Sequence, residues 1–246
     1  MVVNHSPPTS GIFFRYEIPR KLVHLLVGSL ILQAYTHGIS PPQIATWNLH
    51  ALLFFTGVDM LRHHSPAFNA GHHSIFGCLM RPKESARYNS LVWYLLGTYL
   101  ALVLFPTDVG LVGVLILCYS DPAAAMVGRG FAGHSRYLRT GKSVVGTLAA
   151  GVVGGVIGVV FWGDTSAEAS FMFTGRLEVC SGWGVSGNWA VGILGVVSGL
   201  VAAGSEFVDV WGCDDNLVIP MMSSLGLWGF LCVFGGGVRW RESLRI

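Results

Sequence analysis

Seven apolar segments, each close to the length that crosses a bilayer, constrain this chain more than any other feature. A transmembrane helix needs about 20 mostly apolar residues, with a range of about 17–25. Only 11% of the residues are charged, whereas an ordinary soluble domain carries about 25%. The sequence therefore predicts an all-α fold, a polytopic membrane bundle with about seven helices, at residues 22–36, 44–61, 89–106, 109–127, 144–162, 189–205 and 221–237.

Composition argues against a nucleic-acid partner, a disulfide framework and a multidomain chain. The formal net charge of +2 is too small to indicate a nucleic-acid partner. The five cysteines form no CxxC pair, so no disulfide framework is expected. No long linker interrupts the chain, so we expect one membrane-embedded domain over residues 17–238, with short tails at 1–16 and 239–246.

The basic residues suggest an orientation. If the N-terminus faces the cytoplasm, eleven of the 15 basic residues fall on the cytoplasmic side, as the positive-inside rule expects. The acidic segment at 206–215 lies between the sixth and seventh spans, on that same side. Acidic and basic groups from distant parts of the chain are thus predicted to meet at one membrane surface, where ionisable residues usually mark a functional site.

Two basic residues open the first span in "EIPRKLVHLLVG". Arg20 and Lys21 each share a helical face with His24, at spacings of four and three. Cations at such a position can bind phosphate oxygens. The alternative is a plain membrane anchor whose long side chains reach the interface, and spacing alone leaves both open.

Asp121, in "YSDPAAAMVGRG", sits inside an apolar run near the inner end of the fourth span. A carboxylate there needs a cation, a metal or a hydrogen-bond partner. Mg²⁺ would take carboxylate oxygens and keep room for substrate phosphates. We therefore favour a functional role for Asp121.

Glycine-rich turns follow on both sides of the next loop. "GRGFAG" contains Gly128, Arg129 and Gly130, but it follows a membrane helix, so it is no dinucleotide-binding fingerprint. Its backbone N–H groups could still approach a phosphate. "RTGKSVVGT" lacks the first glycine of a P-loop, yet Lys142 and Ser143 begin the fifth span, where a helix N-terminus favours anions.

The segment "SEFVDVWGCDDNLVIP" gathers Glu206, Asp209, Asp214 and Asp215 within ten residues, followed by Asn216. Four such carboxylates repel one another unless they are solvated, protonated or shared by a cation. Because the pair runs directly into apolar residues, we favour a metal or nucleotide site over a solvated loop.

Two further features favour structural roles. Asp59 and Arg62, three residues apart at the end of the second span, could simply pair. "HHSPAFNAGHH" at 63–73 has two His pairs, but no Cys or carboxylate nearby completes a zinc site, so an interfacial loop is the better interpretation.

Carboxylates, cations, glycine-rich turns and a membrane wall together fit phosphoryl transfer to a lipid. A metal would bridge nucleotide phosphates, cations would neutralise developing charge, and a carboxylate would orient the hydroxyl.

At these same residues the chain resembles the CTP-dependent lipid kinases, which include dolichol kinase, phytol kinase and the fungal-type diacylglycerol kinases, the last being the most similar. The resemblance runs in order from Glu17 to Leu225 and rests on five motifs, "EIPRKLVHLLVGSLIL", "RYNSLVWYLLG", "SDPAAAMVGRG", "GKSVVGTLAA" and "SEFVDVWGCDDNLVIPMMSSL".

The resemblance implies transfer of the CTP γ-phosphate to diacylglycerol with a divalent cation, Mg²⁺ or Ca²⁺, at the endoplasmic reticulum or nuclear membrane. By motif, Arg20 and Lys21 match the family's essential basic pair, Asp121 its acidic residue, and Gly128 the glycine that follows. Lys142 matches the later basic position, and Asp214 and Asp215 the acidic pair. Which carboxylate holds metal and which acts as base is left open, so Asp121, Glu206, Asp214 and Asp215 are all candidate metal ligands.

Three other functions remain possible from the sequence. A polyprenol kinase acting on dolichol would share the catalytic side and differ in its lipid groove. A phosphatidate cytidylyltransferase would also use CTP, although its spaced aspartates are missing here. A transporter would fit embedded carboxylates, but the inverted-repeat symmetry typical of transporters is missing.

Overall fold

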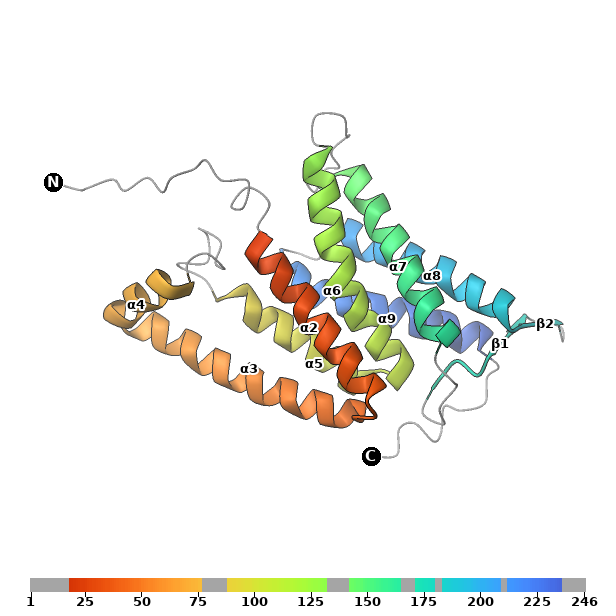
Figure 1. The fold of residues 1–246 in the computed structure, drawn as a ribbon, viewed down its shortest axis with the longest axis horizontal. Coiled ribbons are helices and arrows are strands. Elements are labelled where there is room, and N and C mark those ends of the chain that lie inside the picture. Colours follow the sequence, from red (N-terminus) through yellow and green to blue (C-terminus); the bar gives the residue numbers. More distant parts are fainter. Residues whose placement is uncertain are drawn as a thin grey trace.

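A computed structural model describes residues 18–76, 88–131, 142–164, 171–179, 183–208 and 212–235 of the chain. The predicted tails at 1–16 and 239–246, and Asp209, lie outside these residues. The described part is a helical bundle with one small hairpin (Figure 1). Its helices are α2 (Ile18–Thr36), α3 (Pro41–His64), α4 (Pro66–Phe76), α5 (Ser90–Leu104), α6 (Thr107–Gly130), α7 (Val144–Asp164), α8 (Asn188–Phe207) and α9 (Asp215–Phe234).

Each of the seven predicted spans overlaps one helix of the described part, which confirms the all-α membrane fold. Five helices in the described part, α3, α6, α7, α8 and α9, are long and apolar enough to cross a bilayer. Helix α5 is apolar but has only 15 residues. Together with α2, these helices match the predicted segments in order, because long apolar runs in lipid satisfy their backbone groups internally as helices.

Two local predictions were wrong. The His-rich segment expected as a loop forms helix α4. Helix α9 begins at Asp215, six residues before the expected 221, because Asp214 caps it and Pro220 is tolerated inside it. The connection after α7 contains two short antiparallel strands, β1 (Arg176–Val179) and β2 (Trp183–Ser186), for which no prediction was made.

Helix α6 is the centre of the bundle. Of its most apolar 18-residue window, 78% is buried, against 22–39% for the other four candidate spans. Helices α2, α5, α7 and α9 all pack against it, and Figure 1 shows it running between α2 and α7. Two carboxylates lie in this buried helix, Asp108 near its start and Asp121 near its end. Each must find its partners inside the protein.

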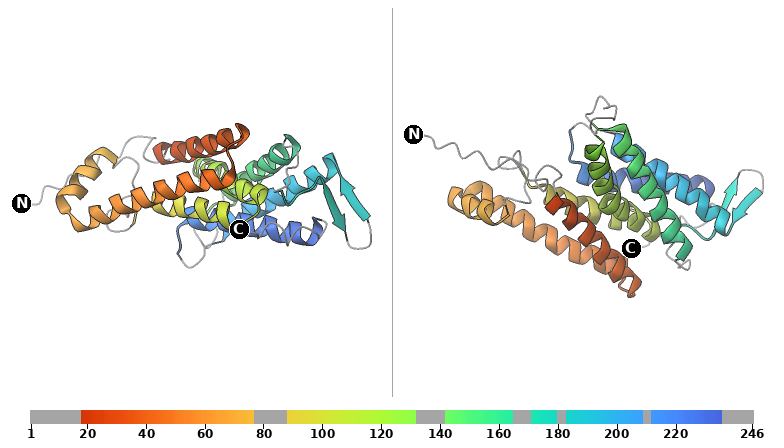
Figure 2. Two further views of the ribbon diagram at one scale, coloured as in Figure 1. Left: turned by 90° about the horizontal axis from the view of Figure 1, so that it is seen from below. Right: turned by 45° about the horizontal axis from the view of Figure 1, so that its top comes forward.

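Asp108 organises the end of the bundle that carries the hairpin. Its side chain is fully buried and accepts hydrogen bonds from the backbone N–H groups of Met172 and Phe173, each at 3.0 Å. The indole Nε1 of Trp162 donates a third at 3.3 Å. Asp108 therefore ties the segment before β1 to both α6 and α7. Helix α4 lies at the opposite end of the molecule from the hairpin (Figure 2), as alternating loops of a membrane bundle require.

Helices α7 and α8 pack antiparallel through glycines, the small-residue packing common between membrane helices. A Cβ on Gly199 would come within 2.7 Å of the carbonyl oxygen of Gly151, and one on Gly195 within 3.2 Å of the oxygen of Gly155. The two backbones therefore approach as closely as glycine allows.

We expect Gly199→Ala to lower the thermal unfolding temperature in detergent, because the added methyl group must push α7 and α8 apart. Gly192→Ala is the matched control on α8, since its Cβ would meet no atom within 4 Å. That control should leave the unfolding temperature unchanged or raise it, because alanine favours helix over glycine by about 1 kcal/mol in soluble hosts. Equal effects of the two substitutions would contradict the close-packing account.

Candidate active site

Asp121 of α6 is neutralised by side chains of α2. The ammonium group of Lys21 donates a hydrogen bond to Oδ2 of Asp121, and His24 Nδ1 lies 3.3 Å from the same oxygen. All three side chains are almost completely buried. Lys21 and His24 reach one carboxylate because they are three residues apart on one face of α2. The side chains of Lys21 and His24, which the sequence analysis placed on one helical face, therefore both point toward α6.

Two residues missed by the sequence analysis complete this cluster. The ring of Tyr94, on α5, lies against the imidazole of His24 with centroids 4.6 Å apart. The Tyr94 hydroxyl in turn lies 3.0 Å from Sγ of Cys118 on α6. Tyr94 therefore fixes where His24 can sit. Nothing in the spacing of a tyrosine within an apolar helix distinguishes it from an ordinary core residue.

Arg20 is buried beside Lys21, at 9% exposure. It occupies the N-terminal end of α2, one turn before His24. A snorkelling anchor would keep its charged head in water, so burial of Arg20 and Lys21 argues against the plain anchor interpretation.

Lys142 forms a second cluster between α7, α8 and α9. Its Nζ lies 3.0 Å from Oδ1 of Asp215 and 3.8 Å from Oε1 of Glu206. Burial alone would lower the pKa of Lys142, but the carboxylates of Glu206 and Asp215 outweigh burial and raise this pKa above its usual value. The ammonium group therefore stays charged through neutral pH, and its own charge is lost only as the pH rises through the raised pKa.

The two clusters lie at one end of the bundle. A Cβ on Gly146, near the start of α7, would fall 2.7 Å from the carbonyl oxygen of Ala124, which lies three residues after Asp121 on α6. The clusters therefore join the N-terminal ends of α2, α7 and α9 to the C-terminal ends of α6 and α8. These ends belong to one side of the predicted topology, as the sequence analysis expected.

Three consecutive residues at the start of α9, Asp214, Asp215 and Asn216, make three different kinds of contact. Asp214 caps the helix, because its Oδ1 accepts the backbone N–H of Asn216 at 3.0 Å. Asp215 pairs with Lys142. The Asn216 side chain is buried and donates to the carbonyl oxygen of Ser90 at 3.3 Å, which ties α9 to α5. The structure therefore directs Asp214 and Asp215 to different partners.

The predicted glycine-rich turns lie where α6 and α7 meet. A Cβ on Gly128 would fall 2.5 Å from Oγ of Ser143, so this glycine permits the close approach of the two helices. Ser143 Oγ also accepts the backbone N–H of Gly146 at 3.0 Å. Gly130 is exposed and Arg129 half-buried. Residues 132–141, which connect the two helices, lie outside the described part.

Asp59 and Arg62 form a buried ion pair, as the structural interpretation favoured. The guanidinium Nε and Nη2 lie 2.9 and 2.8 Å from Oδ1 of Asp59. Oδ2 of Asp59 accepts the backbone N–H of Asn89, which caps α5. The pair therefore joins the end of α3 to the start of α5.

Within the part of the chain that the structure describes, no group of three or more Cys, His, Asp or Glu side chains lies close enough together to hold a metal ion. Of the four predicted metal ligands, Asp121 faces Lys21, Asp214 caps α9, and Glu206 and Asp215 converge on one cation, the Lys142 ammonium. Mg²⁺ usually binds through one or two carboxylates together with substrate phosphates. Glu206 and Asp215 fit that requirement.

We expect Lys21→Met to lower the free energy of unfolding by about 3–5 kcal/mol, because it leaves the buried Asp121 carboxylate without its cation. Adding Asp121→Asn should restore part of this loss, since the uncompensated charge is then removed. Thermal unfolding of both variants in detergent measures the effect. A double variant less stable than Lys21→Met would contradict the ion-pair account.

Comparison of the sequence with known proteins finds several relatives of this chain. It is 33% identical over 213 residues to CTP-dependent diacylglycerol kinase 1 of Saccharomyces cerevisiae, covering 86% of this chain and 72% of the yeast protein. It is 32% identical over 211 residues to the protein of that name in Schizosaccharomyces pombe, covering 85% of this chain and 91% of that one.

A more distant relative is the phytol kinase of Synechocystis sp., 30% identical over 218 residues, with 86% of this chain and 78% of that protein covered. No protein-family model matches the chain, and no solved structure matches it significantly.

Proposed function

The chain belongs to the family of CTP-dependent diacylglycerol kinases, and from this membership we propose that it phosphorylates diacylglycerol with CTP. The bond from the γ-phosphorus to the oxygen bridging the β-phosphorus breaks, and a new bond to the lipid hydroxyl oxygen forms. The products are phosphatidate and CDP, and the hydroxyl proton passes to a base. The observation that carries the proposal is the similarity to two diacylglycerol kinases over about 85% of the chain.

The buried Asp121 cluster supplies the group that would handle the lipid hydroxyl. Asp121 is held in place by Lys21 and His24, and it lies in a helix that crosses the apolar part of the bundle. We assign Asp121 the orientation of the hydroxyl and acceptance of its proton. Lys21 and Arg20 would neutralise charge that develops on the transferred phosphoryl group, the task that cations perform in phosphoryl transfer.

The Lys142 cluster would bind the nucleotide. Lys142 is a charged ammonium at the N-terminal end of α7, where the helix dipole also favours phosphate. Ser143 follows Lys142 in the chain and lies against Gly128. Arg129 and Gly130 are the last residues of α6, and Asn216 follows Asp215 on α9. These residues form the proposed nucleotide side of the site, whereas Asp121 forms the lipid side.

A divalent cation, Mg²⁺ or Ca²⁺, would be held by Glu206 and Asp215, whose oxygens already converge on Lys142. When bound, it would supply charge neutralisation at the nucleotide phosphates. Asp214 would support this site indirectly, by capping the helix that presents Asp215.

We place the protein in the endoplasmic reticulum or nuclear membrane, with the site facing the cytoplasm. The support for the orientation is the predicted cytoplasmic position of eleven of the 15 basic residues, on the side where the two clusters lie.

The proposed reaction is tested by offering purified protein CTP or ATP with diacylglycerol, dolichol or phytol, and identifying the lipid product by mass. We expect phosphatidate from CTP and diacylglycerol at a rate at least about tenfold above any other pair. Faster phosphorylation of dolichol would favour the polyprenol kinase alternative, and a CDP-lipid would favour the cytidylyltransferase.

Asp121→Ala should abolish this activity while the protein still inserts in the membrane, because the lipid hydroxyl loses its orienting carboxylate. The expected fall in kcat is at least about 100-fold, the scale of a lost general base. Asp59→Asn, in the structural ion pair, is the control for general damage to a buried carboxylate. Activity retained in Asp121→Ala would remove this residue from the mechanism.

Asp215→Asn should raise the KM for CTP and the concentration of divalent cation needed, with the KM for diacylglycerol nearly unchanged. Asp214→Ser is the matched neighbour, because serine is also a good N-cap and should preserve α9. If the two variants respond alike to CTP and cation, the separate roles of Asp214 and Asp215 are wrong.

A further inference from the structure

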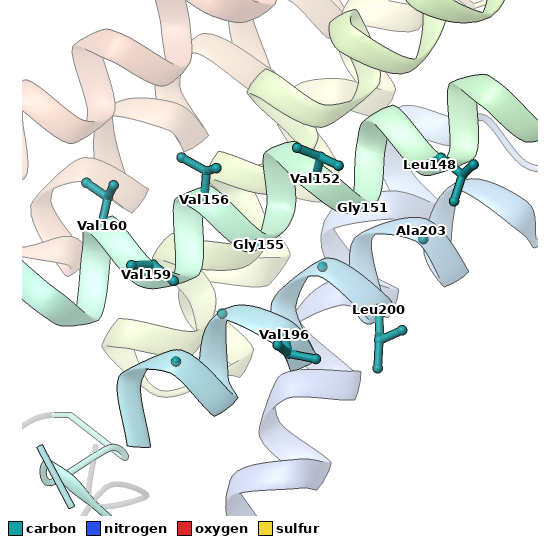
Figure 3. A pocket seen from close by; sticks show the side chains of 13 residues that line it. Leu148, Gly151, Val152, Gly155, Val156, Val159, Val160, Val196, Leu200 and Ala203 are labelled. Atoms are coloured by element: carbon teal, nitrogen blue, oxygen red, sulfur yellow. The ribbon is translucent and has the colours of Figure 1, made fainter. Parts of the chain in front are cut away.

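An apolar groove of about 600 Å³ runs between α7 and α8. Figure 3 shows its side chains, all of them from these two helices and all apolar. Its floor contains the glycines of the close helix contact, among them Gly151 and Gly199. Its rims are exposed valines and leucines, with Val152 and Leu200 at 68% and 69% exposure. The groove therefore opens toward the surroundings of the bundle, which in a membrane are lipid.

One end of the groove lies close to the Lys142 cluster of the candidate active site. The antiparallel register that places Gly155 against Gly195 and Gly151 against Gly199 continues until Lys142 meets Glu206. Leu148, at one end of the groove, is six residues beyond Lys142, and Ala203 is three residues before Glu206. At a rise of about 1.5 Å per residue, the groove begins roughly 5–9 Å below the charged cluster.

The length of the groove fits one leaflet of a bilayer. Along α7 it extends from Leu148 to Val160, which corresponds to about 18 Å of helix. The hydrocarbon core of a bilayer is about 30 Å thick, so half of it is about 15 Å. A hydrocarbon chain whose head lies at the charged cluster would therefore enter the groove about 5–9 Å below the cluster and follow it to the middle of the bilayer.

We infer that the α7–α8 groove binds one acyl chain of the diacylglycerol substrate and so brings its head group to the charged end of the bundle, where Asp121 would receive the hydroxyl and Lys142 would hold the nucleotide. This inference rests on the proposed function, which supplies a lipid with its reacting group at the membrane surface. The apolar side chains that line the groove favour a hydrocarbon chain, whereas the charged side chains of Lys142 and Glu206 disfavour hydrocarbon beyond its end. A second copy of the chain seated in the groove would cover the membrane-side approach to Lys142 and Glu206, and we therefore assign the groove to the lipid.

The inference is tested by filling the groove at mid-length with Val156→Trp or Val196→Trp. These side chains line the groove and are 58% and 63% exposed. Val233→Trp on α9, with Val233 at 64% exposure, is the matched control outside the groove. In detergent micelles, each groove variant should raise the KM for dioleoylglycerol at least about tenfold, the scale of a changed apolar pocket.

Because the acyl chain is proposed to contribute uniform binding, kcat and the KM for CTP should stay within about twofold of the wild type. Dioctanoylglycerol, whose short chains end above the blocked position, should also be affected by less than about twofold. Groove variants that handle dioleoylglycerol like Val233→Trp would overturn the inference, as would groove variants that change the oligomeric state with an unaltered KM for the lipid.

Photo-crosslinking separates this inference from the proposed function. A diacylglycerol with a diazirine near the end of one acyl chain should label α7 and α8 near Val156 and Val196, without CTP. Labelling confined to other helices would overturn the groove assignment even if phosphatidate is formed. If wild-type protein forms no phosphatidate, the proposed function fails, whereas the site of labelling still decides whether the groove holds an acyl chain.

Discussion

The buried ion pair between Lys21 and Asp121 is the interaction on which the arrangement of this bundle depends. Asp121 lies in α6, the most buried of the candidate spans, where an unpaired carboxylate is costly. Its partner comes from a helix 100 residues earlier in the chain. The pairing therefore fixes both the position and the rotation of α2 against α6, and it brings His24 and Arg20 to the same end of the bundle.

Around this pair the structure separates two chemical environments. Asp121, Lys21, His24 and Tyr94 are enclosed by α2, α5 and α6, whereas Lys142, Glu206 and Asp215 lie more openly between α7, α8 and α9. The enclosed cluster suits a group that must meet a lipid hydroxyl, and the open cluster suits a charged, water-soluble nucleotide. The antiparallel packing of α7 on α8 brings Lys142 close to Glu206. Further along the same two helices it forms the apolar groove, which opens toward the bilayer.

Apolar length predicted the helices well, because a segment that crosses lipid must be helical whatever its neighbours do. Charge within an apolar run predicted for the same reason that Asp121 needs a partner, whereas spacing alone left the role of Lys21 open. Local signals were less reliable. The last span was expected to begin at residue 221, yet Asp214 caps its helix earlier, and the paired histidines of α4 were interpreted as a loop.

Partnership between distant residues could not be predicted from the sequence. The acidic pair of α9 looked like one metal site, but Asp214 turns back to its own helix and Asp215 reaches Lys142 across 73 positions. Tyr94 and Asp108 carried no pattern at all, since each acquires its role only through neighbours from other helices. The predicted grouping of the carboxylates into metal ligands and base remains a prediction.

The most direct test of the account is the fate of each phosphate during turnover with diacylglycerol. CTP labelled at the γ-phosphate and CTP labelled at the α-phosphate are supplied in parallel to the purified protein. The account predicts γ-label in phosphatidate and α-label in released CDP. Appearance of the α-label in the lipid, with release of pyrophosphate, would contradict it.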